Sequence, residues 1–214
     1  MLFQGTVGQP SNSSLGAGSN PTVRQGQLGD LVVSELHGRY YEGSYRKSRF
    51  GGSMQAVLAT ATIAGLSTAI TGTSVLANPN GSAVNLVLEK FGVGFVLAPA
   101  APLVYGIATG QSGTALAGTL TSLNPKSKFL GSGISPVGQL YASAAITLPA
   151  APTVDVVLGQ LDTGAITTMT SATGLFDLEG QIVIPPGGYA VFWTSAALLA
   201  SAHIASWSWE EVPV

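Results

Sequence analysis

The stretch IVIPPGGYAVFW, residues 182–193, decides the fold class of this chain. Its two prolines fix consecutive φ angles and its two glycines permit unusual ones, so the four residues are suited to a sharp corner between two apolar strands. The closing stretch HIASWSWEEVPV, residues 203–214, alternates as a strand does, with Trp207 and Trp209 on one side and serines and Glu210 on the other. Both stretches indicate β structure.

A further strand is predicted upstream, in SAVNLVLEKFGVGF, residues 82–95, after the turn sequence Asn78-Pro79-Asn80-Gly81. Asn-Gly readily adopts the positive φ angles of a tight hairpin turn. Short apolar runs separated by Gly, Pro, Asn or Ser recur about every 10 residues, which is typical of sandwiches and jelly rolls. We therefore predict an all-β protein: a jelly-roll-like β-sandwich over residues 54–214 with an extended N-terminal arm.

The chain is poor in charge. Only 8% of the 214 residues are charged and the net charge is −2, against about 25% charged residues in an average soluble domain. Charge repulsion therefore does little to keep copies apart. We expect much of the surface to face other subunits, in a homo-oligomer, although a monomer with a neutral, hydroxyl-rich surface has the same composition.

Residues 1–53 differ in composition from the rest. Residues 1–28 are rich in Gly, Ser, Asn, Gln and Pro without any period, which predicts a flexible arm unless a partner holds it. Residues 29–53 are predicted to be an irregular connector. The start of the chain lacks the basic and apolar regions of a secretory signal, and no uninterrupted apolar run reaches about 18 residues, so we expect no transmembrane helix.

Catalytic motifs are not apparent. The chain has no cysteine, its only histidines are His37 and His203, and no G-x-S-x-G elbow, phosphate loop or zinc spacing occurs. The pair Asp177 and Glu179 could contribute oxygens to a calcium site, but a full site needs about six to eight, and surface charge is the simpler interpretation. The prediction is a protein that is not an enzyme, with no cofactor and no metal.

One segment gathers unusual chemistry: HGRYYEGSYRKSRF, residues 37–50, carries four of the eight basic residues and three tyrosines. Arg and Tyr are enriched at protein interfaces, so we predict that this segment docks on a partner. Phosphate pairing with base stacking is an alternative, but the net charge is negative and no second basic patch is evident; an ordinary solvated hairpin is the other. The predicted interface residues are Arg39, Tyr40, Tyr41, Tyr45, Arg46, Lys47, Arg49 and Phe50.

The segments SAVNLVLEKFGVGF, IVIPPGGYAVFWTSA and WSWEEVPV, together with HGRYYEGSYR, make the chain similar to β-sandwich structural proteins of tailed bacteriophages. These are capsid cement or decoration proteins and head-fibre subunits. The resemblance covers about residues 37–50 and 80–214. It implies a jelly-roll-like body, frequently trimeric, that binds the major capsid protein on the exterior of a viral shell and stabilises it, with neither nucleic acid nor membrane as a partner.

Two other functions fit the sequence. A carbohydrate- or receptor-binding module of a head fibre or tail would use Trp193, Trp207 and Trp209 as an exposed stacking platform, whereas the structural interpretation expects most of them to be buried. A hydrolase on a sandwich scaffold would have to rely on His37, His203 and scattered acids.

Overall fold

The computed structural model describes residues 40–54, 58–59, 68–70, 73–95, 99, 101–143, 146–162, 173–196 and 202–214. The chain divides into two units, Met1–Glu42 and Gly43–Val214. The second unit is the β-sandwich. The predicted arm, residues 1–28, and the predicted connector as far as residue 39 lie outside the described residues.

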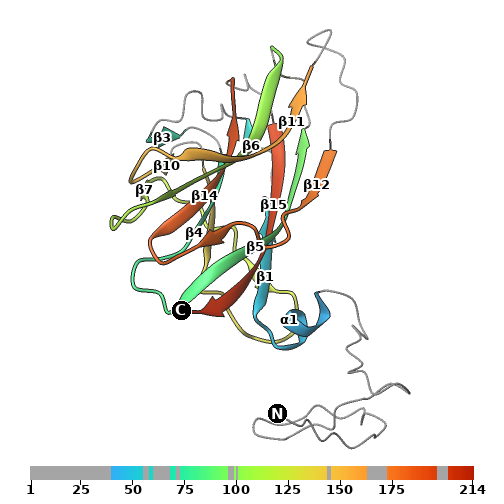
Figure 1. The fold of residues 1–214 in the computed structure, drawn as a ribbon, viewed down its shortest axis with the longest axis vertical. Helices are drawn as coiled ribbons and strands as arrows, with labels where there is room; N and C mark the ends of the chain where they lie inside the picture. The colour runs from blue at the N-terminus through green and yellow to red at the C-terminus, as the bar shows by residue number, and fades with distance from the viewer. Residues whose placement is uncertain are drawn as a thin grey trace, which may run out of the picture. The chain divides into compact units, whose positions relative to one another are not determined.

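The second unit contains two large antiparallel sheets packed against each other (Figure 1). Sheet 1 has the order β12 (Thr173–Asp177), β5 (Val84–Phe95), β15 (Ala202–Pro213), β1 (Arg49–Ser53) and β8 (Lys126–Ser127), with β13 (Val183–Ile184) paired to β5 and β2 (Leu58–Ala59) paired to β15. Sheet 2 has the order β11 (Thr153–Leu161), β6 (Leu103–Gln111), β14 (Gly188–Thr194), β4 (Thr73–Ala77) and β9 (Gln139–Ser143).

The connectivity of the long strands is that of a jelly roll. The first of them pairs with the last, β1 with β15, and the pairing continues inward as β4 with β14, β5 with β12 and β6 with β11. Such nested antiparallel pairs, rolled into two sheets, define the jelly roll. The prediction of an all-β, jelly-roll-like sandwich is confirmed.

Aromatic side chains from both sheets fill the space between them. Phe91 of β5 stacks on Phe192 of β14 at a ring-centroid distance of 5.5 Å and meets Trp207 edge-on at 4.6 Å. Phe95 meets Tyr105 of β6 at 5.3 Å. Because aromatic rings bury a large apolar area each, this cluster is the principal tie between the sheets. The prediction that Trp207 and Trp209 share one side of the last strand is confirmed, and that side faces the core.

Strand β5 contains a bulge, at which the buried positions change from even to odd residue numbers. Leu86 and Leu88 are buried at even positions, whereas Phe91 and Val93 are buried at odd ones. The register with β15 accounts for the change, because Ser208 lies opposite Lys90 and Trp209 opposite Leu88, which leaves Glu89 as the extra residue. The bulge turns Glu89 to the outer face of sheet 1 without moving the apolar residues out of the core.

Two turns join sheet 1 to sheet 2. The Pro-Pro-Gly-Gly corner links β13 to β14, with the Gly188 N–H donating to the Pro185 carbonyl at 2.8 Å and Gly187 at φ 78°. The turn after Asn78 likewise links β4 in sheet 2 to β5 in sheet 1. The expectation of a tight hairpin there is wrong, because the two strands flanking the turn belong to different sheets.

The two turns are fastened together by the buried side chain of Asn78. Its Nδ2 donates to the carbonyls of Val84 at 2.8 Å and Ile184 at 3.0 Å, and its Oδ1 accepts from Ser82. An amide that satisfies both donor and acceptor groups in this way contributes to stability instead of carrying a desolvation penalty. The corner is therefore held by hydrogen bonds as well as by its proline angles.

A third, small sheet covers part of the outer face of sheet 2. It consists of β3 (Ala69–Ile70), β10 (Ile146–Thr147) and β7 (Ala117–Gly118). Ile146 and Leu148 pack with Val75 and Val191 of sheet 2 to form a second apolar cluster. Sheet 2 is consequently buried over part of both faces.

Candidate docking surface

The basic-aromatic segment divides between the interior and the surface of the sandwich. Its last two residues belong to β1, which pairs with β15 and β8 inside sheet 1. The prediction of an irregular connector up to residue 53 is therefore wrong for residues 49–53. Phe50 is buried beside Trp209, with the ring centroids 6.3 Å apart. Arg49 and Phe50, two of the predicted interface residues, are therefore part of the framework and not of an outer surface.

Helix α1 (Tyr41–Tyr45) precedes β1 and ends in a Schellman motif. The N–H of Ser48 donates to the Gly43 carbonyl and the N–H of Lys47 to the Ser44 carbonyl, both at 3.1 Å. Lys47 has φ 63°, the left-handed conformation that this motif requires and that glycine usually supplies. The motif turns the chain sharply and leaves Tyr45 and Arg46 exposed.

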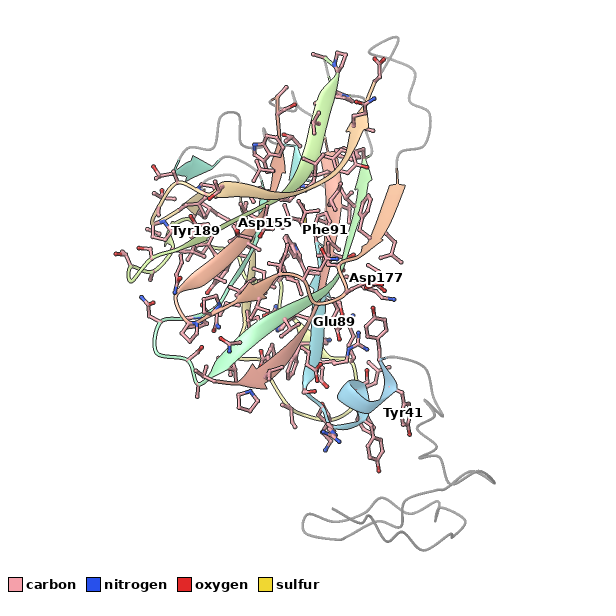
Figure 2. All side chains as sticks on the ribbon, viewed as in Figure 1. Tyr41, Glu89, Phe91, Asp155, Asp177 and Tyr189 are labelled. Atoms are coloured by element: carbon pink, nitrogen blue, oxygen red, sulfur yellow. The ribbon has the colours of Figure 1, made fainter. Side chains whose placement is uncertain are left out.

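A buried ion pair anchors this turn to sheet 1. The guanidinium of Arg49 binds the carboxylate of Glu89 with two donors, Nε to Oε1 at 2.5 Å and Nη2 to Oε2, and both residues are less than a tenth exposed. Ser208 donates to the same carboxylate at 3.2 Å, and Nη1 of Arg49 reaches the Ser44 hydroxyl at 3.0 Å. Figure 2 shows Glu89 on β5. The bulge at Glu89 thus supplies the counter-charge for the residue that begins β1.

Gly43 allows the turn to pack this closely. A Cβ atom at Gly43 would lie 2.8 Å from Cδ of Arg49, a distance that side chains essentially never show. The Ser48 hydroxyl, in addition, donates to Glu210 at 2.7 Å. The turn from residue 43 to residue 48 is therefore held against sheet 1 by charge, hydrogen bonds and close packing.

A second segment, KSKFL at residues 126–130, joins the first at the edge of sheet 1. Strand β8 pairs with Phe50 and Gly51, and the N–H of Lys128 donates to the Arg49 carbonyl at 2.8 Å. The ring of Phe129 meets Tyr45 edge-on at 6.3 Å, and Nζ of Lys47 lies 5.7 Å from its centroid. These contacts bring together two segments about eighty residues apart in the sequence.

We call the resulting patch the basic-aromatic surface. Its members are exposed or half-exposed and combine positive charge with apolar area; they are Tyr45, Arg46, Lys47, Lys126, Lys128, Phe129 and Leu130. Leu130 is 87% exposed, and Tyr45 and Phe129 are 45% and 40% exposed. A large apolar side chain held in water beside four cationic ones is suited to contact with another macromolecule.

Burial and the ion pair beneath the surface act on one of its cations, Lys128. Burial lowers the pKa of Lys128, the positive charge of Arg49 lowers it further, and Glu89 opposes both effects. The exposed acids Asp155, Asp162, Asp177 and Glu179 lie on or beside β11 and β12, and Figure 2 labels two of them. Four cations gather around α1 and β8, where Glu89 and Glu210 are acidic neighbours. Lys90 lies apart from them on β5, in register with Asp177 of β12.

The structure brings together some of the predicted interface residues and not others. Tyr45, Arg46 and Lys47 lie together at the surface, whereas Tyr40 and Tyr41 fall in the first unit and Arg39 lies outside the described residues. The interpretation that no second basic patch exists is corrected, because β8 places Lys126 and Lys128 beside β1. The signal in the sequence was KSKFL itself, a short basic-aromatic run with turn residues after it.

The predicted tryptophan platform does not form. Trp207 and Trp209 are 1% and 0% exposed, and Nε1 of Trp207 donates to Ser74 at 3.0 Å within the core. Trp193 is half-buried against the second apolar cluster on sheet 2. The three rings are therefore separated between two layers of the fold, because β15 directs its tryptophans inward.

His203 is buried and unsuited to proton exchange with a substrate. It packs against the Phe192 ring at 5.0 Å, and neither ring nitrogen has a hydrogen-bond partner among the described residues. Burial lowers its pKa to about 4.

The carboxylate of Asp177 accepts from the backbone N–H of Glu179 and caps a turn. In the described ranges no group of three or more acids and histidines is placed to hold a metal ion.

His37 lies outside the described residues. Across the part of the chain that the structure covers, no helix is long and apolar enough to cross a bilayer. Comparison with known proteins found no matching family model, no matching curated protein and no matching solved structure.

Proposed function

We propose that this chain is a non-enzymatic structural protein of a virion, a cement or decoration protein that binds the outside of a phage capsid. The observation that supports the proposal best is the basic-aromatic surface, which combines four cationic side chains with an exposed Leu130 and is fixed to sheet 1 by the Arg49–Glu89 pair. The binding partner is the major capsid protein, at a site that offers carboxylates around an apolar hollow.

The mechanism is mechanical. A protein bound across a joint between capsid subunits adds buried area that must be exposed again before the shell can rupture. A specific and stable attachment needs a total buried area of about 1,000 Å² or more. The basic-aromatic surface supplies its centre, with Leu130 and Phe129 as apolar anchors and the cations as the charged surroundings.

The proposal includes a homotrimer. The low charge of the chain supports association of like copies. On sheet 1, Leu175 of β12 is 74% exposed and Val212 of β15 is 40% exposed, which provides apolar area apart from Leu130. Size-exclusion chromatography with light scattering tests the stoichiometry directly: a mass three times that of the chain is expected, and a monomer at micromolar concentration contradicts it.

The docking test uses Leu130→Ser, which removes apolar contact area without disturbing the core because the side chain is almost fully exposed. Burying a leucine contributes about 1.5–3 kcal/mol, so affinity for purified capsids in a cosedimentation assay should fall about ten-fold or more. Val157→Ser on β11, 60% exposed and outside both the basic-aromatic surface and the apolar area proposed for the trimer, is the control and should bind as the unaltered protein does. Equal binding by both variants would count against the proposed surface.

Salt dependence separates this function from nucleic-acid binding. Contacts to phosphates give an affinity that falls steeply with salt and does not depend on an apolar anchor. Binding that Leu130→Ser leaves unchanged, but that 0.2 M salt abolishes, would indicate a polyanion instead of a capsid. The glycan platform formed by three tryptophans has no support, since two of the three rings lie in the core.

A further inference from the structure

A hollow of about 370 Å³ lies on the outer face of sheet 2, on the other side of the sandwich from the outer face of sheet 1. Its size is within the range of about 300–1,000 Å³ that small-molecule sites occupy. Strands β4, β9 and β14 form its floor, and the loop after β6 and the turn at Asn80 contribute to its walls. It shares no residue with the basic-aromatic surface.

The hollow exists because a small residue lies between large ones. Ala77 of β4 is in register with Gln139 of β9 on one side and with Tyr189 of β14 on the other. Register partners share a face of a sheet, so the longer side chains stand on either side of a methyl group. Tyr141, two residues beyond Gln139 on the same face, extends the wall.

The lining carries no ionisable acid or base other than two phenols. Burial raises the pKa of Tyr141, and it raises the pKa of Tyr189 to about 12, so both phenols are neutral at physiological pH. Besides the phenols and the buried Asn78 amide, which is bonded within the corner, the lining side chains with hydrogen-bonding capacity are Asn80, Gln139 and Thr114, all exposed to solvent. A site of this kind gives no charge compensation to phosphate, carboxylate or ammonium groups.

Part of the polar capacity of the lining is unused. The Tyr141 hydroxyl donates to Oε1 of Gln139 at 2.9 Å, which fixes the amide so that its Nε2 points away from the tyrosine. Nδ2 of Asn80 donates to the Gly113 carbonyl, which leaves Oδ1 as an acceptor. Among the described residues, neither Nε2 of Gln139 nor the hydroxyl of Thr114 has a side-chain partner. An oriented donor and an oriented acceptor therefore border an apolar floor.

We propose that this hollow binds a neutral saccharide unit. A pyranose has hydroxyl groups that both donate and accept around its rim, which suits an amide donor and an amide acceptor. Its C–H face is apolar and packs on the face of an aromatic ring or on a small apolar floor. Tyr141, Ala77 and Leu116 supply the apolar contacts.

The position of the hollow gives the proposal a further consequence. A particle attached through α1 and β8, at the sheet 1 side, presents the outer face of sheet 2 away from its attachment. A saccharide site there would be accessible to glycans outside the particle. The proposal itself depends only on the hollow, and it can succeed or fail independently of capsid docking.

The test is saturation-transfer NMR on the full chain with glucose, galactose, mannose and N-acetylglucosamine as separate probes at millimolar concentration. At least one should bind. Ala77→Leu fills the floor and should abolish the signal, while Ala117→Leu, the same substitution on exposed β7 outside the hollow, should leave it unchanged. Gln139→Ala, which removes a hydrogen-bonding group at an exposed position, should weaken binding about three- to ten-fold.

Several outcomes would overturn the proposal. They are the absence of transfer from every neutral probe, a signal that persists in Ala77→Leu, and binding of sialic acid or of a proline-rich peptide in preference to the neutral sugars. The Leu130→Ser variant should bind the sugar as the unaltered chain does. A loss of capsid binding with sugar binding intact, or the reverse, therefore identifies which of the two functional proposals has failed.

Discussion

The pair formed by Arg49 and Glu89 provides the sharpest prediction about stability. Glu89→Gln preserves the shape of the side chain but removes its charge. It removes the carboxylate that the guanidinium of Arg49 binds with two donors, and it faces one of those donors with the amide NH₂; the Arg49 residue is 7% exposed. Removing one partner of a buried pair costs about 3–5 kcal/mol. Since the free energy of unfolding of a typical domain is about 5–15 kcal/mol, the variant should lose a large part of its stability.

The reverse change defines the origin of that cost. Arg49→Met leaves the carboxylate of Glu89 buried with only Ser208 as a described hydrogen-bond donor besides the lost guanidinium, and it should be about as destabilising. The double variant Arg49→Met/Glu89→Leu removes both charges together. Its free energy of unfolding should lie within about 1 kcal/mol of that of the unaltered protein, or exceed it. The sum of the two single effects should therefore exceed the effect of the double variant, which loses both charges together.

Urea denaturation followed by tryptophan fluorescence measures the free energy of unfolding of the unaltered protein, the two single variants and the double variant. The signal reports the core, because Trp207 and Trp209 are buried there. Asp162→Asn, which removes an exposed charge after β11, is the control and should change stability by less than about 0.5 kcal/mol. If the free energy of unfolding of Glu89→Gln lies within about 1 kcal/mol of that of the unaltered protein, the pair does not anchor the α1 turn and this interpretation is wrong.

Three further predictions concern single residues. The pKa of His203 is about 4 in the fold against 6.5 in the unfolded chain. The free energy of unfolding should therefore be greatest above pH 6.5 and fall by about 3 kcal/mol as the pH decreases toward 4. In urea denaturation, His203→Phe should show a flatter dependence of this free energy on pH. Lys47→Gly relieves a left-handed φ and should raise stability by about 0.5–1 kcal/mol; a decrease in Tm would contradict this. Gly187→Ala places a Cβ 2.7 Å from the Ser112 carbonyl at φ 78°, and it should lower stability by more than about 1 kcal/mol in the same assay.

Local patterns in the sequence predicted the elements whose chemistry is local. The Pro-Pro-Gly-Gly corner and the inward tryptophans of β15 follow from dihedral preferences and a period of two, and the structure has both. The bulge at Glu89 was not predicted, although the apolar positions change from even to odd between Leu88 and Phe91. A sequence that keeps its apolar residues on one face across such a change requires an extra residue.

Long-range pairing could not be predicted in this way. The turn after Asn78 has a hairpin sequence, but its strands separate into two sheets because β4 pairs with β14 and β5 with β15. Likewise, no local signal places KSKFL beside β1. That contact depends on a strand of two residues, β8, and on one backbone hydrogen bond from Lys128. The sequence therefore predicted the part of the surface that lies in residues 45–47. It did not predict the part in residues 126–130, which the pairing of β8 with β1 brings alongside.

The most direct test of the docking account is hydrogen–deuterium exchange of the protein, free and bound to purified virion heads. Binding through the basic-aromatic surface should slow exchange at residues 43–48 and 126–131 and leave β11 and the corner at residues 185–188 unchanged. Slowed exchange confined to sheet 2, or no change anywhere on mixing with heads, would contradict it.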